Sequence, residues 1–234
     1  MRERIRTNEL MDDPALPAAE HDHALAGLAR LNAWSRSHRL LWDGIAKHAR
    51  KANAAGRTLR VLDVATGSGD APIALAKRAH RAGLKLSWTL VDCSAHALSV
   101  AESHAREAQV EVKTLVADIV ARPLPCEADV VTCSLFLHHC ERDGVKRALQ
   151  HMAQAARTAV GVTDLDRTHR GLWLAWLGSR ILSRSPVVHF DAIASVRAAW
   201  TPQEMQDIAA EAGLASARCT QRWPARWTMW WRAP

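Results

Sequence analysis

The sequence of 234 residues predicts an α/β fold built around one mostly parallel sheet. Between residues 59 and 163, short runs rich in Val, Leu and Thr alternate with segments of helical periodicity, as in strand–helix–strand units. The 48% hydrophobic content is enough for one well-filled domain. After the first predicted strand, a turn with Gly67 and Gly69 leads directly into a helix.

The N-terminal part and the alternating part have distinct patterns. From His23 to Ala49, apolar residues recur at helical spacing and predict one or two amphipathic helices; they are Leu25, Leu28, Leu31, Trp34, Leu41 and Ile45. Strands are then predicted at Leu59–Ala65, Leu86–Val91, Val110–Val116, Asp129–Leu135 and Thr158–Thr163. Helices between them are predicted at Asp70–Ala82, Ala95–Glu107 and Arg142–Ala156.

After residue 163 the regular alternation ends. Gly171–Ser183 is apolar on too many faces for a surface helix, so it is expected in the core, along a ligand cavity or against a partner. Residues 185–199 are expected to be irregular. A helix is predicted from Thr201 to Gly213, because Thr201, Pro202 and Glu204 form a capping box with Pro at the first helical position. Two strands are predicted after it, at Ala215–Thr220 and Arg226–Trp231.

Net charge, cysteine content and apolar runs indicate which partners, cross-links and cell compartment to expect. The net charge of +7 allows a nucleic-acid or anionic membrane partner, but the basic residues form no dense block, which favours an ordinary solvated surface. Five cysteines without a C-x-x-C pair predict neither a disulfide framework nor a zinc ribbon. Without a long apolar run or a signal-peptide core, a cytoplasmic protein with no transmembrane segment is expected.

The glycine turn predicts a nucleoside cofactor that carries a positive charge. Glycines allow unusual φ angles and a close approach of the backbone to a ligand. Pro72 stands where a dinucleotide-binding fingerprint has its third glycine, and the chain has no phosphate-binding G-x-x-x-x-G-K motif. Asp63 and Asp70 flank the turn with negative charge, which disfavours phosphates and suits a sulfonium. These features indicate S-adenosylmethionine.

Asp92 ends the second predicted strand at the same edge of the sheet. A carboxylate at this position is suited to accept hydrogen bonds from both ribose hydroxyls of a nucleoside. The alternative is that Asp92 or Ser94 caps the following helix. Asp118 ends the third predicted strand in the same way. The alternative is that Asp118 is an ordinary surface residue of a loop.

Leu62-Asp63-Val64-Ala65, together with Gly67, Gly69 and Asp70, resembles motif I of class I methyltransferases, particularly those of ubiquinone and menaquinone biosynthesis. The resemblance covers residues 58–165 and implies a Rossmann-like, seven-stranded sheet with its last strand antiparallel. It implies that Asp118 accepts from the adenine amino group and that Ile119 packs on the ring. The implied S-adenosylmethionine site, with S-adenosylhomocysteine as product, comprises Asp63, Ala65, Gly67, Gly69, Asp70, Asp92, Cys93, Asp118, Ile119 and Ser134.

The exit from the fourth strand, Ser134 to His139, resembles the segment that passes the transferring methyl group in these enzymes. It lacks the Asn/Asp-Pro-Pro-aromatic motif of amino-directed nucleic-acid enzymes and the carboxylates of magnesium-dependent ones. His138 or His139 is expected to act as a catalytic base, because histidine titrates near neutral pH. Zinc binding with Cys140 is disfavoured by the spacing, so no metal site is expected.

Further segments are similar to bacterial methyltransferases that accompany polyketide pathways and act on aromatic or quinone-like products. They are Glu9-Leu10-Met11-Asp12, Phe136-Leu137-His138-His139, Asp164-Leu165-x-Arg167 and Ser195-Val196-Arg197. Asp164 and Arg167 are expected either to orient a substrate or to form an ion pair within the loop.

The expected function is metal-independent methyl transfer to a small hydrophobic aromatic acceptor, at oxygen in preference to carbon. The alternatives are an RNA methyltransferase and a non-catalytic partner subunit of a biosynthetic enzyme, and a homodimer is compatible with each. We expect one structural domain, in which residues 1–57 form a helical extension and residues 58–234 the methyltransferase domain. Residues 168–199 are expected as a substrate-side insertion that forms, with the extension, a lid excluding water.

Overall fold

The computed structural model describes residues 1, 3–12, 16–17, 20, 23–24, 27, 30–31, 35 and 37–234. Three apolar positions of the predicted N-terminal helices, Leu25, Leu28 and Trp34, lie outside these residues. Leu41 and Ile45 are fully buried, as a helix with one apolar face requires.

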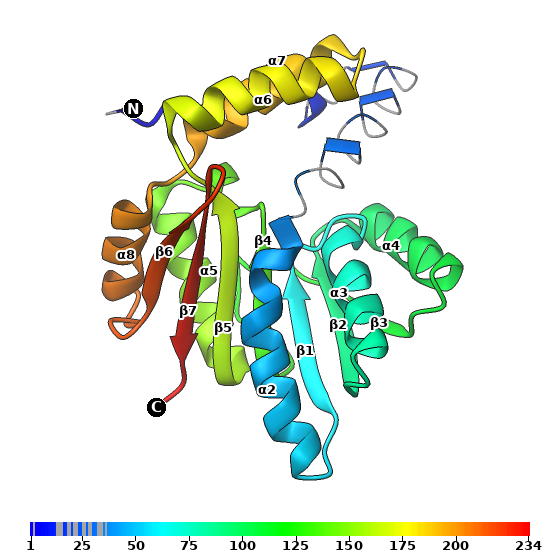
Figure 1. The fold of residues 1–234 in the computed structure, drawn as a ribbon. Coiled ribbons are helices and arrows are strands. Elements are labelled where there is room, and N and C mark those ends of the chain that lie inside the picture. Colours follow the sequence, from blue (N-terminus) through cyan, green and yellow to red (C-terminus); the bar gives the residue numbers. More distant parts are fainter. Residues whose placement is uncertain are drawn as a thin grey trace.

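A seven-stranded sheet forms the centre of the molecule, in the order β3-β2-β1-β4-β5-β7-β6 (Figure 1). β1 to β5 are parallel, and β7 is antiparallel to both of its neighbours, which confirms the predicted Rossmann-like architecture. The strands are β1 (Leu59–Val64), β2 (Leu86–Asp92), β3 (Val112–Val116), β4 (Ala128–Ser134), β5 (Ala156–Leu165), β6 (Arg218–Arg222) and β7 (Arg226–Arg232).

Helices cover both faces of this sheet. On one face, buried residues of α2 (Trp42–Ala54), α3 (Asp70–Arg81) and α4 (Ala95–Glu107) pack with β1 and β2. On the other face, α5 (Arg142–Ala155) and α8 (Pro202–Glu211) pack on β4, β5 and β7. Coverage on both sides explains why the residues of β1 and β4 are almost continuously buried.

α2 packs closely against the sheet at a pair of glycines. A Cβ at Gly44 of α2 or at Gly161 of β5 would lie within 2.6 Å of the Trp230 indole. The missing side chains therefore make room for the ring between helix and strand. Residues 42–54 of the predicted N-terminal lid thus cover a face of the sheet and not the strand ends, because their buried side chains match that face.

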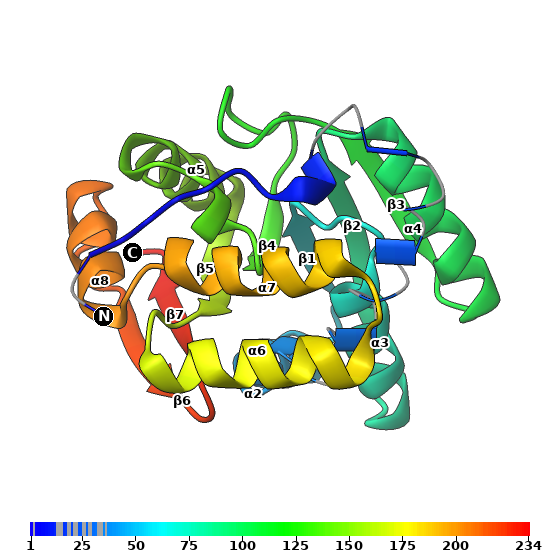
Figure 2. The same cartoon turned by 90° about the horizontal axis from the view of Figure 1, so that it is seen from above.

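Two long helices lie above the carboxyl ends of the strands. α6 (His169–Leu182) and α7 (Pro186–Ala198) run side by side over this edge (Figures 1 and 2). Three short 3-10 helices approach the same edge: η1 (Leu10–Asp12), η2 (Ser37–Leu41) and η3 (Leu137–His139). No helix in the described part of the chain is long and apolar enough to cross a membrane.

The expectation that residues 185–199 are irregular is wrong, because they form α7. Their apolar residues do not gather on one stripe, since α7 packs on α6 along one side and on η1 and η3 along another. The β-branched Val187, Val188 and Val196 also weaken a helical signal. β6 begins at Arg218 and not at Ala215, because a turn occupies the residues after α8.

Candidate active site

The turn between β1 and α3 holds three residues in the left-handed region. The φ angles are 51° at Ala65, 54° at Gly67 and 77° at Gly69. Space at Gly69 is also tight, since a Cβ there would lie 3.0 Å from the Cβ of Ala101. Its successor begins α3, so the turn presents backbone N–H groups at a helix N-terminus. Ala65 adopts a left-handed φ although it carries a side chain, so its backbone is strained, which the sequence does not reveal.

Asp63 supports this turn from beneath. Its two carboxylate oxygens accept hydrogen bonds from the hydroxyls of Thr132, at 2.6 Å, and Thr66, at 2.9 Å. Only 1% of its surface is exposed, and burial raises its pKa to about 6 although both hydroxyls oppose the rise. Asp63 therefore acts on the turn through Thr66 and does not project into the open edge of the sheet.

Asp92 ties the turn to the end of β2. One carboxylate oxygen accepts from the backbone N–H of Gly67 at 2.8 Å, and the other from that of Ser94 at 3.0 Å. Ser94 is the residue that caps α4, accepting from the N–H of Ala97. The helix-capping alternative for Asp92 is therefore wrong, and its carboxylate lies beside the glycine turn.

Asp118 is exposed at the end of the next strand along the same edge. One of its oxygens accepts from the N–H groups of Val120, at 2.8 Å, and Ala121, at 3.1 Å. Ile119 packs in the core with 3% of its surface exposed. The backbone of Ala117 donates to the carbonyl of Asp92, which joins the two strand ends.

The other predicted cofactor residues follow the same edge. Asp70 is exposed at the start of α3 and accepts from the hydroxyl of Ser68 at 3.1 Å. Cys93 is exposed after β2, and burial of its sulfur together with nearby Asp92 raises its pKa. Ser134 is half-buried at the end of β4. The structure thus brings all ten predicted residues to the ends of β1 to β4.

His138 and Asp164 form a buried pair beside this edge. The His138 Nδ1 lies 2.7 Å from a carboxylate oxygen of Asp164, whose other oxygen accepts the backbone N–H of His138. Burial lowers the pKa of His138, but the charge and hydrogen bond of Asp164 outweigh it and raise this pKa above 6.5. Burial raises the pKa of Asp164, and His138 reverses that into a net lowering. The carboxylate holds a proton on Nδ1 and leaves Nε2 for other partners.

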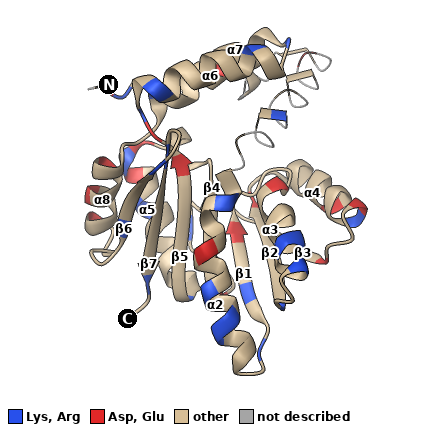
Figure 3. Cartoon of the chain, viewed as in Figure 1, with Lys and Arg blue, Asp and Glu red and all other residues tan. Residues whose placement is uncertain are grey.

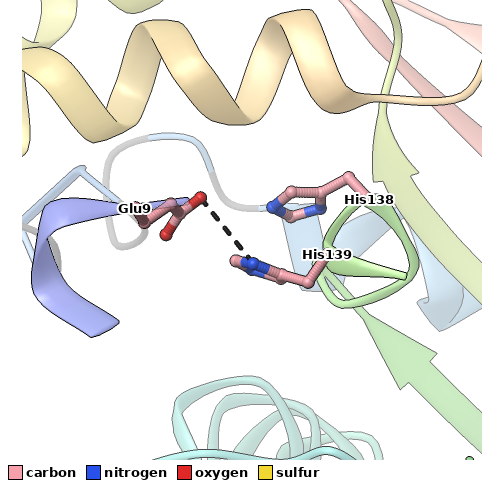
Figure 4. Close-up of side chains that lie close together, drawn as sticks. All are labelled: Glu9, His138 and His139. Carbon is pink, nitrogen blue, oxygen red and sulfur yellow. Dashed lines mark ion pairs between the residues drawn. The ribbon is translucent and has the colours of Figure 1, made fainter. Parts of the chain in front are cut away.

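His139 lies next to His138 in a different electrostatic setting. The two rings are 4.1 Å apart between centroids. Burial, and then the charge of His138, lowers the pKa of His139 to about 3, so it is neutral near neutral pH. Its Nδ1 lies 3.8 Å from a carboxylate oxygen of Glu9, which reaches over from the N-terminal segment (Figure 4). One ligand atom each of Glu9, His138 and His139 lies within 4.8 Å of the others, a donor set that the sequence spacing does not reveal.

Both histidines line a cavity of about 430 Å³ between the strand ends and the helices above them. Most of the lining is apolar, and its residues come from segments far apart in the chain. They include Met11, Leu31, Leu135, Leu165, Leu174, Ala175, Val188, Ala192, Val196 and Pro224, together with the polar Glu9, Asp191, Ser195 and Arg226. Leu135, directly after Ser134, has a left-handed φ of 56° and connects the predicted cofactor edge to this cavity.

The N-terminal segment of residues 3–12 runs alongside α7 (Figure 2), and its Glu9 and Met11 line the cavity. The Arg4 guanidinium donates to the carbonyls of Ala198, at 2.7 Å, and Cys140, at 2.8 Å, and lies 3.9 Å from the ring centroid of Trp200. Asp191 of α7 accepts the backbone N–H groups of residues 10 and 11. Ser195 donates to Glu9, which joins two of the sequence segments noted for their resemblance.

Arg167 lies elsewhere. It is 2% exposed, donates to the carbonyl of Ala199 and forms an ion pair with Glu204 of the capping box at 2.6 Å. The ion pair expected within the loop is therefore not what is observed: Arg167 pairs with Glu204, outside the loop, and stabilises the α7–α8 connection. Arg226 is a cavity residue that the sequence did not point to; the one available signal was an arginine at the start of an otherwise apolar strand.

Similarity to known proteins agrees with this arrangement. A family described as a methyltransferase domain matches residues 61–159, the segment that contains the glycine turn and β4. The chain is 30% identical over 168 residues to the ubiquinone biosynthesis O-methyltransferase of Pseudomonas putida, covering 70% of this chain and 67% of that protein. The chain belongs to the class I S-adenosylmethionine-dependent methyltransferases.

Solved structures show the same fold for this methyltransferase. The magnesium protoporphyrin IX methyltransferase of Synechocystis, with bound S-adenosylhomocysteine, aligns with a TM-score of 0.55 at 15% identity, over 95% of this chain and 90% of that one. A methyltransferase from Aquifex aeolicus aligns with a TM-score of 0.54 at 15% identity, over 74% and 81%. The methyl donor of this enzyme is S-adenosylmethionine. The left-handed turn at Gly67 and Gly69 and the N-terminus of α3 leave backbone N–H groups open to such a ligand.

Proposed function

We propose that this methyltransferase transfers the methyl group of S-adenosylmethionine to a phenolic oxygen of a small hydrophobic aromatic acceptor, without a metal ion. The observation that carries the proposal is the buried His138–Asp164 pair on the wall of an apolar cavity beside the predicted cofactor edge. An apolar cavity with few polar groups is the usual form of a small-molecule site. The Pseudomonas putida relative is itself an O-methyltransferase by name, which supports oxygen over carbon.

For the cofactor, Asp92 is proposed to accept from the ribose hydroxyls and Asp118 from the adenine amino group. Asp92 is already oriented by Gly67 and Ser94, so little side-chain freedom is lost on binding. The Gly67–Gly69 turn admits the amino-acid part close to the backbone, and Asp70 and Ser134 complete the edge. When bound, S-adenosylmethionine supplies an electrophilic methyl group on a sulfonium.

For the acceptor, His138 is proposed to remove the phenol proton. Its Nδ1–H is held by Asp164, so Nε2 is the basic nitrogen available to the cavity. The imidazolium formed when His138 takes the proton is stabilised by the adjacent carboxylate. His139, whose pKa lies near 3, contributes a neutral ring to the wall. The helices α6 and α7, with residues 3–12, are proposed as the lid that excludes water from the reacting groups.

RNA is the other class of methyl acceptor that the basic net charge allows. The Arg222–Trp227 segment mixes cations with aromatics, but Trp227 is fully buried and donates its Nε1–H to the carbonyl of Trp200. Lys and Arg lie on several elements, among them α2, α3 and β1 (Figure 3). These features favour a small-molecule acceptor over RNA.

The test is incubation with isotope-labelled S-adenosylmethionine and a panel of phenols, quinols and phenolic polyketides, read by mass spectrometry. We expect label on oxygen of at least one panel member in the wild type, and a much slower reaction in His138→Ala. Label on tRNA or rRNA with no labelled phenol would overturn the proposal. Label on ring carbon would retain the acceptor class and refute O-methylation.

A further inference from the structure

One cation lies among the apolar residues of the cavity. Arg226, the first residue of β7, is the only Lys or Arg among the described lining residues. Its Nε donates to the hydroxyl of buried Ser37 at 3.0 Å, and its Nη1 to the carbonyl of Ala225 at 3.0 Å. These bonds hold the guanidinium in one orientation, and its Nη2 makes no hydrogen bond to any described residue.

No described carboxylate makes a direct ion pair with this guanidinium. Within the described chain, Arg226 has no ion pair at 4.0 Å or less. Asp164 is its neighbour across the β5–β7 ladder, where Leu165 pairs with Arg226, but Asp164 already accepts from His138 and from the N–H of Leu165. Burial lowers the pKa of Arg226 to about 10, opposed by Asp164, so the group stays charged at neutral pH.

The acidic residues of the cavity have other partners. Glu9 accepts from Ser195, and Asp191 accepts two backbone N–H groups of the N-terminal segment. His139 is neutral near neutral pH. Arg226 is half-buried, and Asp164 acts on it without direct contact. An anionic ligand group would supply the direct partner that the guanidinium lacks among the described residues.

We propose that Arg226 binds a carboxylate carried by the aromatic acceptor, so that the substrates are hydroxyaryl carboxylic acids. This rests on the proposed function, because it takes the cavity as the acceptor site. A guanidinium offers a planar pair of N–H donors that matches a carboxylate. Since Arg226 and His138 line the same cavity and lie near enough for the charge of Arg226 to act on His138, the acid group would be bound near the base that acts on the hydroxyl.

The experiment measures binding to the full chain loaded with S-adenosylhomocysteine, by calorimetry. The probes are hydroxybenzoates with and without an alkyl tail, each paired with its benzamide, which keeps the size and removes the charge. In the wild type we expect at least one acid to bind about tenfold or more tighter than its amide. Arg226→Met should abolish that preference, and Arg226→Lys should restore only part of it.

Arg222→Met is the matched control, since Arg222 is exposed on the same hairpin and does not line the cavity. It should retain the wild-type preference. If no acid binds more tightly than its amide, or if Arg226→Met keeps the preference while still binding S-adenosylhomocysteine, the carboxylate site is refuted. In that case, continued methylation of the benzamides or neutral phenols would leave the proposed function intact, whereas no methylation of any phenol would count against both.

Discussion

The predicted cofactor edge and the acceptor cavity lie side by side but are built in different ways. The edge consists mainly of turns that directly follow β1, β2 and β3, and its contacts Gly67 to Asp92 and Asp63 to Thr132 span 25 and 69 positions. The cavity is closed by contacts such as Glu9 to Ser195 and Arg4 to Ala198, which span 186 and 194 positions. The edge is therefore built between neighbouring strands of the parallel sheet, whereas the cavity forms only when the two ends of the chain come together.

The comparison also separates two kinds of polar group. At the edge, Asp92 is oriented by the backbone N–H groups of Gly67 and Ser94, and Asp118 by that of Val120 in its own turn. In the cavity, His138, Asp164 and Arg226 are buried or partly buried, and their pKa values are shifted by one another and by desolvation. Shifted pKa values are typical of sites where protons move.

Replacement of the proposed base should give the largest effect. We expect His138→Ala to lower kcat about a hundredfold or more, because proton removal by a positioned base contributes on this order. S-adenosylhomocysteine binding, measured by calorimetry, should not change. His139→Ala should lower kcat far less, since its nitrogen is neutral and weakly basic. Equal activity in both variants and the wild type would leave positioning alone as the source of catalysis.

Loss of Asp92 should test the other region. Asp92→Ala is expected to weaken S-adenosylhomocysteine binding about a hundredfold, because two hydrogen bonds to a charged group and the support of Gly67 are lost together. Asp143→Ala, at an exposed acid on α5, is the control and should bind normally. Unchanged affinity in Asp92→Ala would refute the assignment of this edge to the ribose.

The pH profile should distinguish an active base from a structural histidine. Because Asp164 raises the pKa of His138, the neutral, basic form appears only as pH rises through a value above 6.5, so kcat should increase over that range. In Asp164→Asn, burial is no longer opposed by a carboxylate, and the midpoint should move to lower pH with a lower plateau. A profile that keeps its midpoint in Asp164→Asn would exclude His138 as the titrating group.

Release of the N-terminal segment should have a smaller effect, confined to the cavity. Arg4→Ala removes hydrogen bonds to η3 and α7, and we expect KM for the acceptor to rise about threefold to tenfold. KM for S-adenosylmethionine should stay the same. Arg6→Ala is the matched control, because among the described residues Arg6 forms its ion pair with exposed Glu141 and makes no hydrogen bond to η3 or α7. A rise in the cofactor KM instead would mean that the segment serves the cofactor edge.

Removal of metal ions should have the smallest effect. Dialysis against EDTA is expected to leave kcat unchanged, because His138 acts through a proton held by Asp164. The measurement is activity before dialysis, after it, and after addition of Mg²⁺ or Zn²⁺. A loss of activity that either ion restores would identify Glu9, His138 and His139 as ligands and replace the proposed mechanism.

Local features of the sequence were sufficient for most of the fold. Alternating apolar runs and capping residues predicted the strands and helices from β1 to β5, and the Thr201 capping box predicted α8, because these signals lie within a few residues. The glycine turn and the acids at the ends of β2 and β3 were predicted for the same reason, because each lies within a few residues of its strand. α7 was missed because its apolar residues serve two different neighbours and leave no single stripe.

The sequence by itself determined a class I methyltransferase fold with S-adenosylmethionine as donor, because motif spacing fixes which residues end neighbouring parallel strands. It named His138 and His139 but could not distinguish them, since adjacent residues differ only in what surrounds them. Tertiary structure decided that His138 pairs with Asp164 and that Glu9 and Arg226 enter one cavity. Burial and charge shift a pKa only through groups brought close by folding, and those groups are far apart along this chain.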